Sequence, residues 1–192
     1  MWAALSSWEA GVLLWIQTAL RNPITDPLLS AFTHLGDAGV LFIVLTLALL
    51  VWPKTRKVGL ACGLGLLFSL LFTNIILKHL VSRVRPWVDF PAIVPLVVEG
   101  DPLSFPSGHT SAAFAFALAF VRTWPRDWAH SKAVRAGVVV LATLMALSRL
   151  YVGVHYPTDV LGGFIVGDLA GLAGWGLSVW LLRRFQPSEQ TL

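Results

Sequence analysis

The chain has 192 residues, of which 56% are hydrophobic and only 12% are charged. An ordinary soluble domain is about 45–50% apolar and about 25% charged, so this composition excludes a typical soluble domain and indicates a polytopic membrane protein. The mean hydropathy of +0.74 agrees. The net charge of +4 does not by itself imply a nucleic-acid partner, because membrane proteins distribute Lys and Arg by side of the bilayer.

The N-terminal region is amphipathic. Within residues 5–22, apolar side chains that include Trp8 and Trp15 recur at helical spacing, and polar side chains such as Glu9 and Arg21 lie between them. The segment is too short and too polar to span, so we expect a helix in the membrane interface with its tryptophans at headgroup depth. Because a basic region and a small-residue cleavage site are both missing, we expect no cleavable signal peptide.

Five apolar runs are candidates for membrane-spanning helices, which need about 20 residues each. They cover residues 38–52, 57–80, 109–124, 134–151 and 157–182. A sixth span is expected only if the N-terminal region inserts. The sequence therefore predicts an all-α polytopic membrane helix bundle in one domain, with interfacial helices in residues 1–36 and the transmembrane bundle in residues 37–182. The lone cysteine, Cys62, offers neither an intramolecular disulfide nor a metal-ligand spacing.

Basic residues are divided unequally between the two ends of this predicted bundle. Alternating spans put nine on one face: Lys54, Arg56, Lys57, Arg122, Arg126, Lys132, Arg135, Arg183 and Arg184. The other face carries Arg21, Lys78, Arg83, Arg85 and Arg149. The positive-inside rule makes the nine-charge face cytoplasmic, so the second face is expected to be extracytoplasmic.

Small residues form a stripe in the last apolar run, where Gly163, Gly167 and Gly171 recur at every fourth residue. Such a stripe lets another helix approach closely. We expect close packing within the bundle, and a dimer interface is the alternative.

Three polar clusters fall at span ends on the predicted extracytoplasmic face: KHLVSRVRP (78–86), PSGH (106–109) and SRLYVGVHYPTDV (148–160). Lys78, Arg85 and Arg149 are cations near the membrane edge, where burying a charge costs several kcal/mol unless it is partnered. Because no comparable set of acids lies nearby in the sequence, the expected partner is an external anion. Phosphate suits both the planar fork of Arg and the point charge of Lys.

The PSGH motif precedes an apolar run and therefore marks a helix N-terminus. Free backbone N–H groups and the helix dipole favour an anion there. Ser107 can add a hydroxyl group, and Gly108 permits a close approach of the backbone.

Two histidines add reactive chemistry to this anion site. Asp159 follows His155 by four residues, so its carboxylate can hold one ring nitrogen and leave the other to attack phosphorus. His109 can lie across the phosphate and protonate the leaving oxygen. The set fits in-line phosphoryl transfer through a phosphohistidine, in which cations stabilise the equatorial oxygens and no metal or other cofactor is needed.

Each of these residues also has a structural interpretation. Arg149 or Lys78 alone could anchor a helix end at the interface, and His109 alone could cap its own helix. His155 with Asp159 could be half of a metal site, but zinc would need a third ligand.

The remaining charged residues are not expected to take part in the reaction. Arg83 is expected at the rim of the site, where it could touch a lipid headgroup. The long loop carries three acids that are expected to be solvated: Asp89, Glu99 and Asp101. Asp168, inside the last span, is assigned no role beyond a hydrogen bond within the bundle.

The three motifs together resemble the signature of the type 2 phosphatidic acid phosphatase superfamily. The matching positions are Lys78, Arg85 and Pro86; Pro106, Ser107, Gly108 and His109; and Ser148, Arg149, His155 and Asp159. The resemblance spans about 80 residues, departs from the family pattern at no motif position, and is specific for the family but not for the substrate.

The resemblance implies a role for each matched residue. His155 would be the nucleophile, Asp159 would orient it, and His109 would act as the acid and then as the base for water. The residues that would hold phosphate are Lys78, Arg85, Ser107, Gly108 and Arg149.

By the same resemblance the expected protein is an integral membrane lipid phosphatase of the cell membrane, with its site on the extracytoplasmic face and the lipid bilayer as its surroundings. Undecaprenyl diphosphate is the favoured substrate, with phosphatidylglycerophosphate or phosphatidate next. A lipid phosphotransferase and a non-enzymatic lipid or anion carrier remain alternatives, and the oligomeric state is left open. No nucleic-acid partner is expected.

Overall fold

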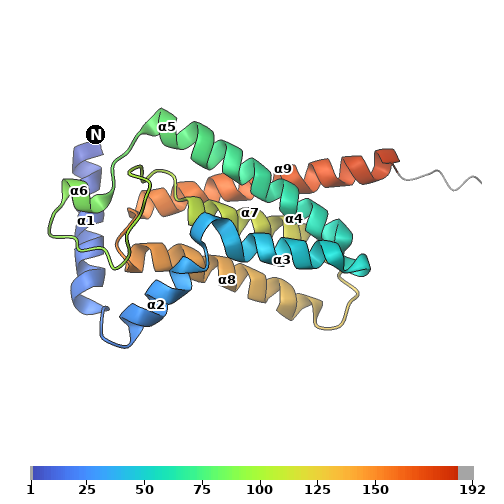
Figure 1. The fold of residues 1–192 in the computed structure, drawn as a ribbon, viewed down its shortest axis with the longest axis horizontal. Helices are drawn as coiled ribbons and strands as arrows, with labels where there is room; N and C mark the ends of the chain where they lie inside the picture. The colour runs from blue at the N-terminus through green and yellow to red at the C-terminus, as the bar shows by residue number, and fades with distance from the viewer. Residues whose placement is uncertain (1, 186–192) are drawn as a thin grey trace, which may run out of the picture.

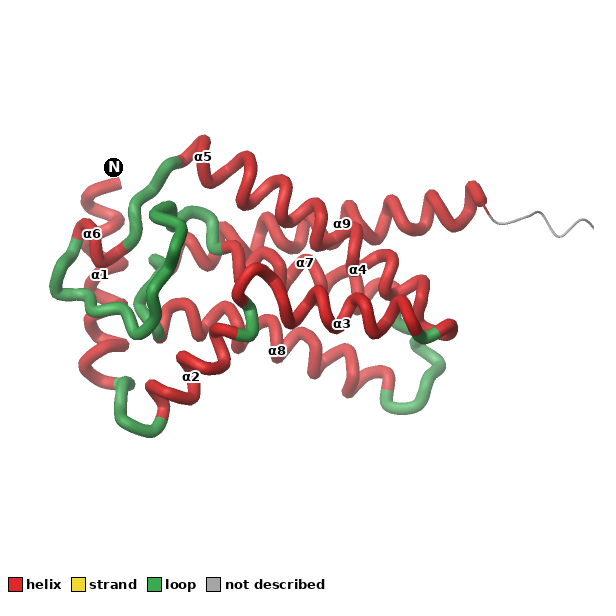
Figure 2. Tube along the Cα trace, viewed as in Figure 1, coloured by secondary structure: helices red, strands yellow, loops and turns green. Residues whose placement is uncertain are grey.

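The protein is described by a computed structural model that covers residues 2–185, and every regular element in that range is helical (Figures 1 and 2). The elements are α1 (Trp2–Ala19), α2 (Thr25–His34), η1 (Asp37–Gly39), α3 (Val40–Val51), η2 (Pro53–Thr55), α4 (Arg56–Ser69), η3 (Leu70–Leu77), α5 (Lys78–Val81), α6 (Pro86–Asp89), α7 (Gly108–Thr123), α8 (Ser131–Tyr151) and α9 (Pro157–Phe185). Residues 53–81 form one long continuous helix that includes the π-helical segment η3.

The long helices lie side by side, with α7 in the middle of the bundle (Figure 1). Helix α7 packs against α4, α8 and α9, and α3 packs against α4. On α7, Ala113, Ala115 and Ala119 are fully buried, and Phe116 fills the core beside Phe42 of α3. Small side chains on α7 therefore let three helices approach it closely.

Helix α1 lies across one end of the bundle, where it contacts the ends of α8 and α9 (Figure 1). Trp8 and Trp15 are 63% and 58% exposed, whereas Leu13 is buried, so apolar side chains lie on both the outer and the inner face of the helix. Glu9 points inward and is 0% exposed. The expected amphipathic character of α1 therefore stays a prediction. The location of α1 in a membrane interface stays a prediction.

Three helices in the described part of the chain are long and apolar enough to cross a membrane: Pro53–Val81, Ser131–Tyr151 and Pro157–Phe185. A fourth candidate is the pair Thr25–His34 and Asp37–Val51, which is bent by 48°. Helix α7 has only 16 residues and is about 24 Å long, which is less than the roughly 30 Å thickness of a bilayer core. The all-α membrane bundle is confirmed.

The count of five or six spans stays a prediction. The same holds for the division of the single domain into interfacial helices before residue 37 and a transmembrane bundle after it. The predicted domain of residues 1–192 also includes residues outside the described range.

The glycine stripe of α9 packs inside the bundle. A Cβ atom at Gly163, Gly167 or Gly171 would lie 2.5–2.6 Å from a backbone oxygen of the PSGH segment or α7. The expectation of close packing within the bundle is confirmed.

The polar clusters and the main group of basic residues lie at opposite ends of the bundle. The α3–α4 turn, the α7–α8 loop and the C-terminal end of α9 gather at one end, and the three motif segments gather at the other (Figures 1 and 2). Successive long helices therefore run in opposite directions, as was assumed when the basic residues were divided between the two faces.

The tight contact of α9 with α4 predicts a steric effect at Gly174. A Cβ atom there would lie 2.6 Å from the Gly65 Cα atom, so we expect Gly174→Ala to destabilise the protein by about 1–3 kcal/mol, the usual cost of overpacking. Gly176→Ala is the matched control, because no atom lies within 4 Å of a Cβ at that position. Thermal unfolding in detergent measures both, and equal melting temperatures for the two variants would contradict the packing argument.

Candidate active site

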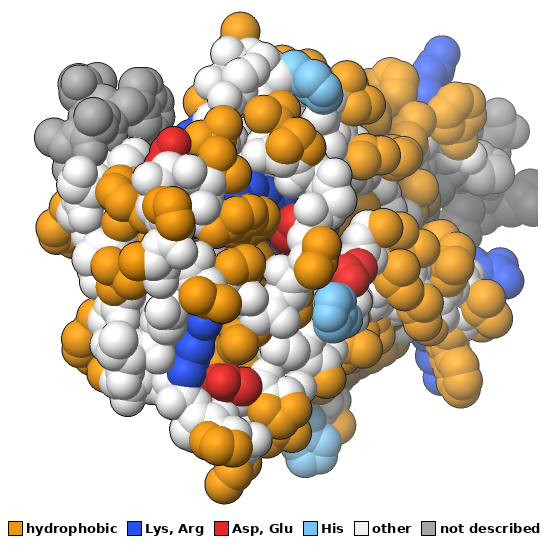
Figure 3. All heavy atoms as spheres, turned by 60° about the vertical axis from the view of Figure 1, so that its left-hand side comes forward, with side chains coloured by type: hydrophobic (Ala, Val, Ile, Leu, Met, Phe, Trp, Pro, Cys, Tyr) orange, Lys and Arg blue, Asp and Glu red, His pale blue; other side chains and the backbone are white. Residues whose placement is uncertain are grey.

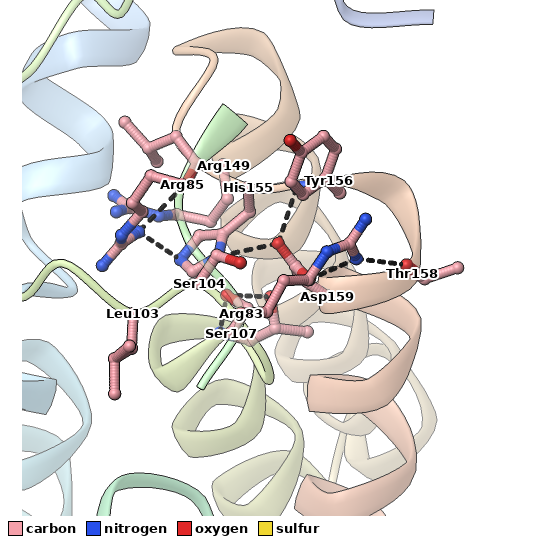
Figure 4. Close-up of polar contacts among 12 residues, drawn as sticks. Arg83, Arg85, Leu103, Ser104, Ser107, Arg149, His155, Tyr156, Thr158 and Asp159 are labelled. Carbon is pink, nitrogen blue, oxygen red and sulfur yellow. Dashed lines mark hydrogen bonds and ion pairs between the residues drawn. The ribbon is translucent and has the colours of Figure 1, made fainter. Parts of the chain in front are cut away.

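The three motif segments meet at one end of the bundle (Figure 4). Arg149 lies in the last turn of α8, His155 lies in the short loop that follows, and Asp159 lies in the first turn of α9. Gly153 lets this loop reverse because it adopts a positive φ of 79°, a conformation that other residues rarely adopt. The backbone N–H of Ser107 donates to the Asp159 carbonyl oxygen at 3.0 Å, which ties the PSGH segment to α9.

His155 is held with a defined ring orientation. Its side chain is buried, its Nε2 lies 3.0 Å from Arg85 Nη1, and its Nδ1 lies 3.6 Å from Asp159 Oδ2. Because an Arg nitrogen can only donate, Nε2 must be the acceptor and the proton is assigned to Nδ1. The lone pair of Nε2 therefore faces the cations, and the Nδ1–H group faces the carboxylate.

The surroundings of His155 favour its neutral form. Burial lowers the pKa of His155 well below its usual value, and the positive charges of Arg85, Arg149 and Lys78 lower it further. The imidazole is therefore unprotonated at neutral pH, which is the state that a nucleophile requires.

All three predicted phosphate-binding cations are buried: Lys78 is 8%, Arg85 1% and Arg149 0% exposed. The expectation that the loop acids are solvated is wrong for Glu99, whose side chain is 16% exposed and contacts both Arg149 and Arg85, the latter at 3.4 Å. Asp101 contacts Lys78, although its own side chain is 42% exposed. The loop between α6 and α7, which carries Glu99 and Asp101, packs onto the cations because buried cations require negative charge beside them.

Glu99 lies between two of these cations. One of its carboxylate oxygens faces Arg149 and the other faces Arg85, so the two arginines together hold one anionic group. Charged side chains of both signs are visible in a hollow on this end of the protein, surrounded by hydrophobic side chains (Figure 3). Asp89 is also partnered, because it accepts a hydrogen bond from the Tyr156 hydroxyl at 3.3 Å.

Ser107 and Gly108 open α7 as the sequence predicted. The Ser107 hydroxyl accepts hydrogen bonds from the Thr110 N–H at 3.4 Å and the Thr110 hydroxyl at 3.0 Å, and it is fully buried. In this structure Ser107 therefore caps the helix, whereas Gly108 lies at the wall of the cavity described below.

His109 is oriented by an acid that sequence reasoning missed. Its Nε2 lies 3.0 Å from Asp37 Oδ1, and the other oxygen of Asp37 lies 2.7 Å from His34 Nδ1. Gly36 lets the ring sit this close, because a Cβ there would be 2.5 Å from His109 Cδ2. Asp37 is 72 residues from His109, so no local spacing indicated the contact.

Arg83 is not the rim charge that the sequence suggested. Its side chain is 8% exposed, and it contacts the carboxylates of Asp159 and Glu9. Thr33 of α2 was missed as well: its hydroxyl accepts hydrogen bonds from Arg149 Nη1 and from the Ser148 hydroxyl.

A cavity of about 680 Å³ begins at the site and continues between α3 and α4. Its polar end includes Lys78, Arg85, His109 and His155. Its other lining residues are mainly apolar and include Ile43, Leu47, Leu50, Leu60 and Leu67. Three of the predicted site residues are not among those that line the cavity: Ser107, Arg149 and Asp159.

Among the described residues, no group of three or more His, Cys, Asp or Glu side chains is arranged to hold a metal ion. The charged end of the cavity is lined by two imidazoles, two cations and the Glu99 carboxylate, next to an apolar channel. Such a site can bind the phosphoryl group of a molecule that also has an apolar part.

Comparison with known proteins defines the family. Residues 58–183, more than half of the chain, match the model of the PAP2 superfamily. The phosphatidylglycerophosphatase B of Bacillus subtilis is 36% identical over 162 residues, which cover 78% of this chain and 73% of that protein. The decaprenylphosphoryl-5-phosphoribose phosphatase of Mycobacterium tuberculosis is 33% identical over 165 residues, which cover 85% of this chain and 86% of the relative.

A solved structure is also similar. The crystal structure of the transmembrane PAP2-type phosphatidylglycerolphosphate phosphatase from Bacillus subtilis aligns with a TM-score of 0.72 and 31% identity, covering 97% of this chain and 90% of that one. The chain therefore belongs to the PAP2 superfamily of membrane lipid phosphatases.

The position of Glu99 predicts competition with anions. In Glu99→Gln the two arginines lose their charged partner, so we expect vanadate, a phosphate mimic, to bind about tenfold more tightly, which corresponds to 1.4 kcal/mol. The unliganded variant should also melt at a lower temperature, because two buried cations are left without compensation.

Vanadate inhibition and thermal unfolding with and without vanadate test this expectation. Asp89→Asn is the control, since Asp89 contacts Tyr156 rather than the cations. Unchanged vanadate affinity in Glu99→Gln would show that the carboxylate does not compete with the anion.

Proposed function

We propose that the protein hydrolyses a lipid phosphate or diphosphate through a phosphohistidine on His155, without a metal ion. The observation that carries this proposal is the neutral Nε2 of His155, which points at a cluster of buried cations at the charged end of an apolar cavity. A nucleophile, an anion site and a channel for a hydrocarbon tail thus lie together.

The reaction proceeds in two steps that leave His155 unchanged. Nε2 attacks phosphorus and forms a P–N bond while the bond to the leaving oxygen breaks, and His109 supplies the proton that this oxygen takes up. His109 then removes a proton from water, and the hydroxide forms a P–O bond while the P–N bond to His155 breaks, which releases inorganic phosphate and restores the imidazole. Lys78, Arg85 and Arg149 stabilise the negative charge on the equatorial oxygens in both steps.

Asp159 supports the nucleophile through the other ring nitrogen. Its carboxylate oxygen Oδ2 faces Nδ1 of His155, so it holds the tautomer with the lone pair on Nε2 and stabilises the positive charge that develops on the ring. The 3.6 Å separation is longer than a hydrogen bond, and catalytic contacts of this kind often shorten when substrate binds. Backbone groups at Ser107 and Gly108 add the N-terminal end of α7 to the anion site.

The apolar part of the cavity favours a substrate with a long tail. It follows α3 from Gly39 to Leu50, which corresponds to about 16 Å of helix and reaches roughly half the thickness of a bilayer core. A headgroup at the cations therefore lets one chain extend between α3 and α4 to about the middle of the membrane. Undecaprenyl diphosphate is the favoured substrate, and the similarity to a phosphatase of a decaprenylphosphoryl compound supports this class.

The site is proposed to face the extracytoplasmic side of the cell membrane. The argument is the concentration of basic residues at the opposite end of the bundle, in the α3–α4 turn, in the α7–α8 loop and at the end of α9. Short cytoplasmic loops carry such an excess of Lys and Arg.

Phosphate release from a panel of purified lipids tests the function. We expect the purified protein to act, in the presence of EDTA, on undecaprenyl diphosphate faster than on phosphatidylglycerophosphate and phosphatidate. His155→Asn should lose about 10⁴-fold or more in kcat while it still binds vanadate.

Two outcomes of this test would contradict the proposal. Loss of activity in EDTA with recovery on adding a divalent metal would exclude the metal-free reaction. Full lipid or anion transport by His155→Asn, without hydrolysis by the unmodified protein, would instead identify a carrier.

The tail channel makes a second prediction at Gly63, which lines the cavity opposite Thr46. In Gly63→Leu the added side chain fills the channel, so KM for a long-chain lipid phosphate should rise about tenfold or more, which corresponds to 1.4 kcal/mol or more of lost binding. KM for a water-soluble phosphate ester should not change, because its binding does not use the channel.

Gly137→Leu is the matched control, since Gly137 of α8 has nothing within 4 Å of a Cβ and lies away from the cavity. Equal effects of Gly63→Leu on long-chain and soluble substrates would exclude the channel as the tail site.

A further inference from the structure

Arg83 joins two acids that come from opposite ends of the chain. Its Nη1 donates to Asp159 Oδ1 at 2.8 Å, and its Nη2 donates to Glu9 Oε2. Glu9 lies on α1, 150 residues before Asp159, and both acids are 0% exposed. Figure 4 shows the guanidinium of Arg83 beside Asp159 and Thr158, with His155 on the far side of the carboxylate.

Glu9 is fixed by further contacts to the start of α9. Its Oε1 accepts hydrogen bonds from the Thr158 backbone N–H at 2.7 Å and from the Thr158 hydroxyl at 2.6 Å. The carboxylate therefore lies at the N-terminal end of this helix, where a negative charge is favourable. The Arg83 guanidinium also lies 3.8 Å from the centre of the Tyr156 ring, so its plane is held between the ring and the two acids.

This arrangement divides the two oxygens of Asp159 between two partners. Oδ1 accepts from Arg83, whereas Oδ2 accepts from the Tyr156 backbone N–H at 2.8 Å and faces His155 Nδ1. A guanidinium commonly binds a carboxylate through two parallel hydrogen bonds. Arg83 donates to Asp159 through Nη1, which also donates to the Thr158 hydroxyl at 2.7 Å, whereas Nη2 donates to Glu9 and to the Ser6 hydroxyl at 3.1 Å.

We propose that Glu9 is a positioning residue of the reaction: by holding one side of the Arg83 guanidinium, it keeps Asp159 Oδ2 available to His155. Without the Glu9 charge, Nη2 loses an anionic acceptor while the neutral Ser6 hydroxyl remains, so the guanidinium is drawn toward Asp159 and takes both of its oxygens. His155 then loses the acceptor that holds its tautomer and stabilises its positive charge. Glu9 itself touches neither the cavity nor the reacting atoms, so it acts through Arg83. This inference rests on the phosphohistidine reaction proposed above.

The effect should appear in kcat and not in anion binding. Outer partners that orient a histidine typically change activity by about 10- to 100-fold, so we expect Glu9→Gln to lower kcat by that factor. KM and vanadate affinity should change less than about threefold, because Lys78, Arg85 and Arg149 stay in place. A purely structural role of α1 would instead lower the amount of active protein and leave the kcat of the folded fraction unchanged.

Gln17 provides the matched control on the same helix. Its side chain also fastens α1 to the rest of the protein, through the Ala92 carbonyl oxygen at 3.1 Å and the Val94 N–H at 2.8 Å, but it does not contact Arg83. Gln17→Ala should therefore keep the kcat of the unmodified protein. An equal loss of kcat in Gln17→Ala and Glu9→Gln would overturn the proposal, because docking of α1 would then explain both.

Arg83→Lys tests the same contacts, because Arg83 lies between Glu9 and Asp159. Lysine keeps the charge but lacks the fork that reaches both acids, so we expect a similar loss of kcat, and this variant alone carries the test if Glu9→Gln does not fold. In the double variant Glu9→Gln/Arg83→Lys, the losses of kcat should be less than additive, since both substitutions disrupt the same Glu9–Arg83–Asp159 contacts. Additive losses, or an unchanged kcat in either folded single variant, would refute the inference.

The unmodified protein and His155→Asn are assayed in parallel. If the unmodified protein has no phosphatase activity, or His155→Asn keeps it, the proposed function fails. If both behave as proposed and the Glu9 and Arg83 variants keep their kcat, only the role of Glu9 fails.

Discussion

The buried cations at one end of the bundle impose the main physical requirement on this structure. A charge removed from water at the edge of a bilayer is costly unless an opposite charge and hydrogen bonds accompany it. Lys78, Arg85 and Arg149 meet this requirement through acids of the long loop. The requirement explains why a loop with little regular structure between α6 and α7 packs onto the site.

The same requirement acts on Arg83, which has its own pair of acids behind the nucleophile. The site thus contains two separate charged layers, one in front of His155 and one behind it. The front layer opens onto the cavity, whereas the rear layer is enclosed by α1, α9 and the Tyr156 ring. Helix α1 is therefore part of the site architecture as well as a covering element at the end of the bundle.

Much of the site could be predicted from sequence because its reactive residues lie in short motifs at helix ends. Lys78, His109 and His155 come together because alternating helices return the chain to the same end of the bundle. Counting the apolar runs is enough to predict which helix ends share that face. The all-α architecture followed from composition and the lengths of apolar runs. The span count is harder, since α7 is enclosed by other helices and does not need the length of a lipid-exposed helix.

The missed contacts share a physical origin. Glu99 and Asp101 lie in a loop whose path depends on the charges it compensates, and nothing in the local sequence shows that it folds inward. Asp37 and Glu9 come from the N-terminal region. That region was interpreted from the spacing of its apolar side chains, which does not show where its acids point. Contacts across 72 residues or more leave no local period, so a single sequence contains no signal for them.

Glu99 has a consequence for how the resting site treats ions that diffuse past it. A carboxylate attached to the same chain acts at an effective concentration on the order of millimolar, so an inorganic anion must displace it using contacts to the cations alone. Under the proposed function, a lipid substrate adds the free energy of placing its tail between α3 and α4. The loop would then set a threshold that an anchored headgroup passes more easily than a free ion, and discrimination of this kind needs no residue dedicated to rejecting the wrong ligand.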